Sequence, residues 1–433
     1  QEEFENRKKE YESKNPNVKI VYRKFSNLEE YEQLLVNEIA EGEGPDIFSI
    51  KNSWVNKHQK KMSPFPVGKT SLPLNAEIFQ ETYFHTASKD LIRENEIYAI
   101  PLFIDSLALY YNKQIFRDNI PNTDKPAETW EDIQKQVTQI TKENNSIERF
   151  AISGAAIGRA DNIFRGIDIF SALLLEYGVK IISEADGKAV FGQQQGVIEG
   201  TGDAYFPFTE GLKLYTSFGK SNFKNYSWNN TITSFSKEAK ELNPFLREKV
   251  AMIFGYSYLY DDLITMRRQM KTVGEKVLDE SNIGIIEFPQ ILPFAETGKR
   301  DALALYFPLS VSRNSENTDY AWDFVQFLSS KESLADYHEK TKKPSSRKDM
   351  VDEQMTEPLY GVFARQASYA KSLLGEGDIK PEFFDNIFYK AIQDSLTHKK
   401  ELSQISKKAE ERVNCQIEKE SKLGEVDIDC LEI

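Results

Sequence analysis

Three tyrosines at alternate positions are the residues of this sequence whose chemistry best suits ligand binding. Tyr256, Tyr258 and Tyr260 follow the apolar run 250–254, which is typical of a buried strand. Each ring offers a flat apolar face and a polar tip, and sugars, with apolar C–H faces and hydroxyl rims, suit such a surface. The alternative is that these tyrosines are half-buried strand residues with no ligand role.

Groups suited to nucleophilic, acid–base or metal chemistry do not cluster along the sequence. The histidines lie singly, at His58, His85, His338 and His398. No H-E-x-x-H, G-x-S-x-G or C-x-x-C motif is present, and Gly68-Lys69-Thr70 lacks the upstream glycine of a P-loop. We therefore expect no catalytic residue, no metal and no cofactor.

Length and charge narrow the class of protein further. A chain of 433 residues is expected to form two domains. Its net charge of −13, without a stripe of Lys and Arg, argues against nucleic acid as a partner. Cys415 and Cys430 are the two cysteines, and a disulfide or two free thiols are equally compatible with their spacing.

The elements that would position these residues alternate between strands and helices. Val18–Tyr22 alternates as a strand, Ser26 and Glu29 fit a capping box before a helix, and Asp46–Ile50 is a second strand. This β-α-β order implies a parallel sheet. Further strands are expected at 107–111, 150–152, 250–254, 283–288 and 302–311, and further helices at 133–140, 169–177, 210–218, 320–329, 331–339, 381–396 and 401–413.

A series of short motifs also runs along the chain in a characteristic order. They are Asn15-Pro16-Asn17-Val18-Lys19-Ile20-Val21, Gly44-Pro45-Asp46-Ile47-Phe48, the blocks 97–102 and 105–113, and the blocks 126–132, 249–258 and 321–332. Over about residues 4–413 this order resembles the family 1 extracellular solute-binding proteins, the group that includes maltose- and other oligosaccharide-binding proteins of ABC importers. The block 105–113 is the most specific piece.

The resemblance implies an α/β, two-lobed, type II periplasmic-binding-protein-like fold. Each lobe would be a mostly parallel sheet flanked by helices, and hinge strands would join the lobes. The expected first lobe comprises 1–110 and 288–313, the second comprises 111–287 and 314–413, and a polar tail follows at 414–433. The family's first strand would precede Phe4, so the sequence is expected to be trimmed or a fragment, and a missing central strand would expose ladder groups of its neighbours.

The same resemblance implies a function without chemistry. The protein would capture a small ligand, expected to be an oligosaccharide, in a cleft between the lobes, close by hinge motion and deliver it to an ABC transporter permease. We expect an extracytoplasmic monomer, anchored to the membrane by an N-terminal segment outside this chain. The alternatives are a secreted carbohydrate-active enzyme, which would need paired carboxylates about 5 to 10 Å apart, and a ligand-sensing ectodomain.

Candidate ligand-binding residues follow from strand ends and from the family pattern. In open α/β sheets ligands bind beyond the carboxyl ends of strands. Tyr258 is the strongest candidate, because it matches a family position where an aromatic ring stacks on ligand. The full set is Asn52, Ser53, Trp54, Asp105, Arg165, Asp168, Trp228, Tyr256, Tyr258 and Tyr260.

Each of these candidates has a structural alternative. Trp54 is as much a packing residue as a platform, and Asp105 could cap a helix or hold a loop. Salt bridging is the favoured role for Arg165 and Asp168, which lie with Asn162 near a helix start. Trp228 is either buried under its loop or exposed to ligand.

Overall fold

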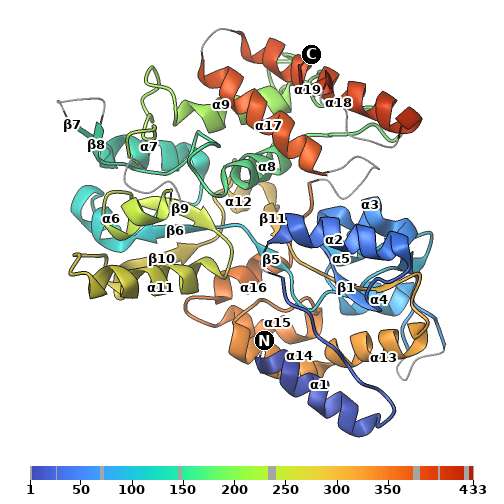
Figure 1. Cartoon of the computed structure of the whole chain (residues 1–433). Coiled ribbons are helices and arrows are strands. Elements are labelled where there is room, and N and C mark those ends of the chain that lie inside the picture. The colour runs from blue at the N-terminus through green and yellow to red at the C-terminus, as the bar shows by residue number, and fades with distance from the viewer. Residues whose placement is uncertain are drawn as a thin grey trace. The chain divides into compact units, whose positions relative to one another are not determined.

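The computed structural model describes residues 2–25, 27–68, 73–144, 149–232, 240–373, 381–397, 400–423 and 429–432. The chain divides into two compact units, whose elements are labelled in Figure 1. Unit 1 comprises 1–105 and 304–378, and unit 2 comprises 106–303 and 379–433. The chain passes from one unit to the other three times: within β5 (Asp105–Ser106), within β11 (Ala302–Leu305), and between residues 378 and 379.

This division differs from the boundaries expected from the sequence. Residues 106–110 and 288–303 belong to unit 2, and 314–378 belong to unit 1. The second difference arises because α13 (Thr318–Leu328) packs against β12 (Leu309–Ser312) of unit 1. An amphipathic pattern shows that a helix has a buried face, but it does not show which sheet that face covers.

Unit 1 is built on a small sheet in the order β1-β12-β2, formed by Ile47–Ser49, Leu309–Ser312 and Met62–Ser63. Helices surround it, and β13 (Ala370–Lys371) pairs with β11. The remaining elements are α1 (Glu2–Lys14), α2 (Leu28–Glu41), η1 (Asn52–Trp54), α3 (Val55–His58), η2 (Gln59–Lys61), α4 (Ala76–Thr82), α5 (His85–Leu91), β3 (Ile92–Arg93), β4 (Glu96–Ile97), α14 (Lys331–Thr341), η4 (Lys348–Met350), α15 (Val351–Met355) and α16 (Gly361–Ala367).

The expected parallel β-α-β unit is not what the structure shows. The strand β1 pairs antiparallel with β12, with Ile47 opposite Val311. Residues 18–22, expected to be a strand, have no strand pairing among the described residues. The helix between them does form, as α2, but Ser26 of the expected capping box lies outside the described residues. Asn27 provides a cap instead, because its side-chain oxygen accepts from the Glu30 amide at 3.2 Å.

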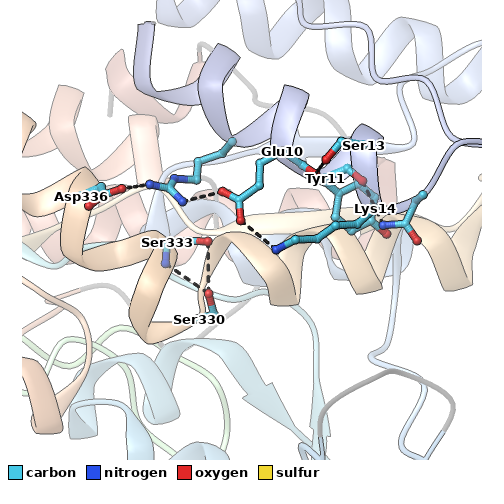
Figure 2. A network of polar contacts seen from close by, with 9 residues as sticks. Glu10, Tyr11, Ser13, Lys14, Ser330, Ser333 and Asp336 are labelled. Atoms are coloured by element: carbon cyan, nitrogen blue, oxygen red, sulfur yellow. Dashed lines mark hydrogen bonds and ion pairs between the residues drawn. The ribbon is translucent and has the colours of Figure 1, made fainter.

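Helix α1 is fastened to α13 and α14 by polar contacts around its outer turns. Glu10 accepts from the Arg7 guanidinium at 2.7 Å and from the Lys14 ammonium at 2.8 Å. The pair of Glu10 and Lys14 can be followed in Figure 2. Arg7 also contacts Asp336 of α14. On the inner face the Tyr11 hydroxyl donates to Asp323 of α13 at 2.8 Å. These contacts hold the apolar face of α1 in the core of unit 1.

Unit 2 has a central sheet in the order β10-β6-β9, formed by Ile283–Ile286, Ala108–Asn112 and Met252–Gly255. The middle strand β6 pairs antiparallel with both neighbours, so this sheet is also not the expected parallel one. Asn112 ends β6 and caps the next helix, accepting from the Gln114 amide at 2.9 Å. The expected capping box at Thr129 is confirmed, since its hydroxyl accepts from the Asp132 amide at 3.4 Å.

Helices and short strands surround this sheet. They are α6 (Lys113–Asn119), α7 (Trp130–Ile140), β7 (Lys142–Asn144), β8 (Arg149–Ile152), α8 (Gly166–Glu176), α9 (Pro207–Ser217), α10 (Leu242–Leu246), α11 (Leu259–Thr272), η3 (Glu280–Asn282), α12 (Phe294–Thr297), α17 (Pro381–Leu396), α18 (Leu402–Leu423) and α19 (Asp429–Glu432). The last helices α17 and α18 pack side by side on α9 (Figure 1). None of the helices, within the described ranges, is long and apolar enough to cross a bilayer.

Parts of two helices lie within 414–433, the stretch predicted as a polar tail. Helix α18 continues past residue 413 to Leu423, and a disulfide joins Cys415 in α18 to Cys430 in α19. The sequence did not distinguish a disulfide from two free thiols, and the structure contains the disulfide.

A buried histidine in unit 1 predicts a loss of stability in acid. Burial lowers the pKa of His338 in α14 from 6.5 to about 4. Because the folded state holds the neutral ring, its contribution is complete above pH 6.5 and is lost as pH falls toward 4. At about 1.4 kcal/mol per pH unit the loss is about 3 kcal/mol. Urea unfolding of wild type and His338→Leu between pH 4 and 7 measures it.

The variant should show a flatter dependence of unfolding free energy on pH than the wild type. His85→Gln is the matched control, since His85 is exposed in α5 and its replacement should leave the pH dependence unchanged. Parallel curves for wild type and His338→Leu would contradict the prediction.

Candidate functional site

The tyrosines that follow β9 do not continue an alternating strand. The strand ends at Gly255, and Tyr258 is already the N-cap residue of α11. A Cβ at position 255 would lie 2.2 Å from a methyl carbon of Leu259, so glycine permits this immediate turn into the helix. The turn leaves Tyr256 buried at 1% exposure and Tyr258 accessible at 36%. Their rings stack at 6.1 Å with an interplanar angle of 22°.

An arginine completes this stack from a distant part of the sequence. Arg165, at the N-cap of α8, places its guanidinium 5.3 Å from the Tyr256 ring centre and 5.6 Å from that of Tyr258. It also donates a hydrogen bond to the Tyr258 hydroxyl. Asp168, one turn along α8, lies 3.4 Å from the same guanidinium. Four predicted site residues therefore meet on unit 2, and we call them the Arg165 cluster: Arg165, Asp168, Tyr256 and Tyr258.

Tyr260 does not continue the alternation read from the sequence. It lies in the first turn of α11, where successive residues turn by about 100° instead of alternating. Its hydroxyl donates to Glu280 at 3.1 Å. Tyr260 therefore has a separate structural partner.

Trp228 is fully buried, so of the two alternatives, burial under its loop and exposure to ligand, the structure shows the first. Its indole N–H donates to the side-chain oxygen of Asn162 at 2.9 Å, and the Asn162 amide donates to the Asn229 carbonyl at 3.0 Å. The ring and Asn162 thus tie two loops of unit 2 together. The prediction of an exposed ligand contact at Trp228 is not supported by this placement.

Asn52 and Trp54 are buried in the interior of unit 1. Trp54 is 4% exposed, with the edge of the His58 ring against it, so it packs rather than offering a platform. Asn52 is buried, accepts from the Tyr306 amide at 3.3 Å and donates to the Ser372 hydroxyl at 2.7 Å. Both residues follow the end of β1, as the sequence predicted, but the segment that carries them turns into the core of unit 1.

Ser53 and Asp105 also lie within unit 1. The Ser53 hydroxyl is buried without a hydrogen-bond partner among the described residues. Asp105 is buried near Lys343; burial lowers the pKa of that ammonium, and attraction to Asp105 opposes the shift. Asp105 therefore sits in a paired, interior position.

Sequence reasoning missed the residues that hold the Arg165 cluster in place. Glu241 is 1% exposed, and both its oxygens accept from the Phe164 amide, at 3.0 and 3.1 Å. Phe164 precedes Arg165 and is itself exposed, with the Lys240 ammonium 5.1 Å from its ring centre. Asp262 belongs to the same neighbourhood: burial and Asp261 raise its pKa, and the Arg165 charge opposes this. No motif marks any of them.

The cluster combines an accessible aromatic face, guanidinium donors and carboxylate acceptors. Such a surface suits a neutral, hydroxyl-rich ligand with apolar faces. Within the described ranges, no group of three or more His, Cys, Asp or Glu side chains is placed to hold a metal ion.

Glu241 should make the stability of unit 2 fall as pH rises. Burial raises its carboxyl pKa from 4.5 to about 7. The folded state prefers the protonated form, so its contribution is complete below pH 4.5 and is lost as pH rises through about 7. At about 1.4 kcal/mol per pH unit this is about 3 kcal/mol. Urea unfolding of wild type and Glu241→Gln at pH 5 to 8 measures it.

The unfolding free energy of Glu241→Gln, relative to that of the wild type, should rise steadily as pH rises. Loss of the hydrogen-bond acceptor adds a difference that does not change with pH. Glu210→Gln is the control, because the Glu210 carboxyl on α9 is only half-covered. Its unfolding free energy should follow that of the wild type. An unfolding free energy difference between wild type and Glu241→Gln that does not change with pH would refute the assignment.

Comparison with known proteins gives one family and one fold. The family model described as bacterial extracellular solute-binding protein matches residues 6–359. A protein of Brucella abortus (strain 2308) named as a binding protein is 21% identical over 336 residues, covering 77% of this chain and 70% of the relative.

Solved structures show the fold. The sugar-binding protein MalE of Xanthomonas citri has a TM-score of 0.70 at 13% identity, covering 95% of this chain and 93% of that one. A cyclo/maltodextrin-binding protein in complex with maltotetraose gives 0.69 at 17%, covering 98% and 94%. A solute-binding protein of Thermotoga lettingae bound with α-D-tagatose gives 0.67 at 18%, covering 96% and 95%. The expected two-lobed solute-binding fold is confirmed.

Proposed function

The chain belongs to the bacterial extracellular solute-binding proteins, and we propose that it captures an oligosaccharide outside the cytoplasm and delivers it to the permease of an ABC importer. The observation that carries the choice of a sugar is the Arg165 cluster. Solved proteins of the same fold are bound to maltotetraose, α-D-tagatose and cycloalternan. The candidate ligands are therefore sugars of one or more hexose units.

The accessible Tyr258 ring is the platform in this proposal. A pyranose presents alternating C–H bonds on each face, and such a face packs on an aromatic ring while its hydroxyls stay at the edge. Arg165 already stacks on the two rings, and in this proposal its guanidinium donates to sugar hydroxyls beside the Tyr258 ring. Asp168 and Asp262 supply acceptors for the sugar hydroxyl protons.

The Arg165 cluster is also largely preformed. Tyr256 is fixed in the core, and its carbonyl accepts from the buried Tyr110 hydroxyl at 2.7 Å. Glu241 fixes the backbone on which Arg165 stands. Little conformational freedom remains to be lost on binding, which favours affinity.

The proposed mechanism contains no chemical step. Ligand binding would favour a closed arrangement of the lobes, because the ligand's contacts are complete only there, and the permease would recognise that state. In this proposal the protein is a monomer without catalytic activity, held on the extracytoplasmic side of the membrane, at the cell surface or in the periplasm, by an N-terminal anchor.

A thermal-shift screen tests the function. Maltose, maltotetraose, tagatose and a cyclic glucan are compared with a tripeptide, spermidine and Ca²⁺, each over a range of concentrations. At least one sugar should raise the melting temperature in proportion to the logarithm of its concentration, because it binds the folded state alone. Failure of every sugar, or shortening of the oligosaccharide during incubation, would exclude the proposed receptor.

Tyr258→Ala should weaken the sugar found in that screen by about tenfold or more, equivalent to about 1.4 kcal/mol, measured by isothermal titration calorimetry. Tyr260→Ala is the matched control, because it removes the same side chain two residues away, where the partner is Glu280. It should change the dissociation constant by less than about threefold. Equal losses in the two variants would place the ligand elsewhere.

A further inference from the structure

A buried carboxyl group of unit 1 lies outside the Arg165 cluster. Asp90, in α5, is 2% exposed. Its Oδ2 atom accepts from the Tyr306 hydroxyl and from the Ser372 hydroxyl, each at 2.6 Å. Burial raises the pKa of Asp90, and the hydrogen bonds from Ser372, Tyr306 and Asn52 oppose that shift. Burial of an acidic side chain costs free energy, and these hydrogen bonds offset the cost while they hold two distant segments together.

The two hydroxyl donors lie on segments that carry the chain from one unit to the other. Tyr306 follows β11, within which the chain passes from unit 2 to unit 1. Ser372 follows β13 and comes shortly before the passage between residues 378 and 379. We call these two passages the β11 connection and the β13 connection. Asp90 therefore fastens two of the three connections to unit 1.

Further side chains hold the same two segments. The Thr86 hydroxyl of α5 donates to the Ala370 carbonyl in β13. Asn52 of η1 donates to the Ser372 hydroxyl at 2.7 Å, and its side-chain oxygen accepts from the Tyr306 amide at 3.3 Å. The Asn52 amide in turn donates to the Tyr306 carbonyl at 2.9 Å. Both connections are thus bonded to the same two elements of unit 1, α5 and η1.

The way in which a connection is fastened decides how much movement it permits. Hinge motion is absorbed by the few residues whose backbone dihedral angles are free to change. A segment that is hydrogen-bonded to a packed helix keeps its dihedral angles, so bending is confined to the residues beyond the bonded point. When the bonds are removed, bending spreads into unit 1 and the range of arrangements grows.

We propose that Asp90 is a positioning residue for the β11 and β13 connections, and that its hydrogen bonds limit the movement of the two units. Because both donors reach Oδ2, the role belongs to an acceptor oxygen and not to the charge. The consequence for ligand rests on the proposed function: a chain with fewer ligand-free arrangements loses less conformational freedom when a sugar binds. The restraint itself is independent of any ligand.

The test measures movement in the ligand-free chain. Spin labels are placed at Val67→Cys in unit 1 and Val273→Cys in unit 2, two positions that are 63% and 74% exposed. The native cysteines form a disulfide and take no label. Pulsed electron–electron double resonance gives the distribution of distances between the labels. Asp90→Ala should broaden it at least about 1.5-fold, whereas Asp90→Asn, which keeps an acceptor oxygen, should leave it within about 1.2-fold of the labelled parent.

Tyr306→Phe removes one donor and should also broaden the distribution. Tyr11→Phe is the matched control, because it too removes a buried tyrosine hydroxyl of unit 1 that donates to a carboxylate, Asp323, at 2.8 Å. That bond joins α1 to α13 and holds neither connection, so the distribution should stay that of the parent. Thermal melting followed by circular dichroism establishes that each variant is folded at the temperature of the measurement.

If Asp90→Ala does not fold, Ser372→Ala decides, because it removes a single donor from a half-buried position and should broaden the distribution by itself. The proposal is overturned if neither Ser372→Ala nor Tyr306→Phe broadens the distribution, or if Tyr11→Phe broadens it as much. Equal broadening in Asp90→Asn and Asp90→Ala would also overturn it. Since no ligand is added, failure of every sugar in the thermal-shift screen leaves this result unaffected.

Discussion

The stack of the Arg165 guanidinium on Tyr256 and Tyr258 is the interaction on which the rest of the candidate site depends. A guanidinium over two aromatic faces is favourable only if both rings and the arginine are held in register. The structure supplies that register from two elements, the end of β9 and the start of α8. Neither element alone presents a binding surface.

Each half of the stack is fixed by a buried group that itself contacts no ligand. On the β9 side, Gly255 allows α11 to begin at once, so that Tyr256 stays in the core while Tyr258 emerges. On the α8 side, Glu241 holds the Phe164 amide with both oxygens. Burial of an acidic side chain is costly, and Glu241, which lies beside the start of α8, orients the backbone that carries Arg165.

The sequence predicted the family and most helices, but not the strand pairings or the interior loops. The resemblance carried by ordered motifs is confirmed by the family match, and the helices begin close to where capping residues and apolar spacing placed them. Pairing direction failed because a β-α-β order is local, whereas β12 returns to β1 from more than 250 residues away. The positions of Tyr260 in α11 and of Trp54 in the interior of unit 1 were not predicted, because spacing cannot show where a strand gives way to a helix or which way a loop turns.

The last helices contribute to the site although they lie beyond the stretch that the family model matches. Helix α17 contacts both α8 and α9, and Phe388 of α17 meets Phe170 of α8 at 5.5 Å and Phe208 of α9 at 5.7 Å between ring centres. Since α8 carries Arg165 at its start, its position depends on this aromatic packing. The disulfide lies in the two following helices, where it joins Cys415 in the second half of α18 to Cys430 in α19. Helix α17 is therefore part of the scaffold that positions α8, and with it Arg165.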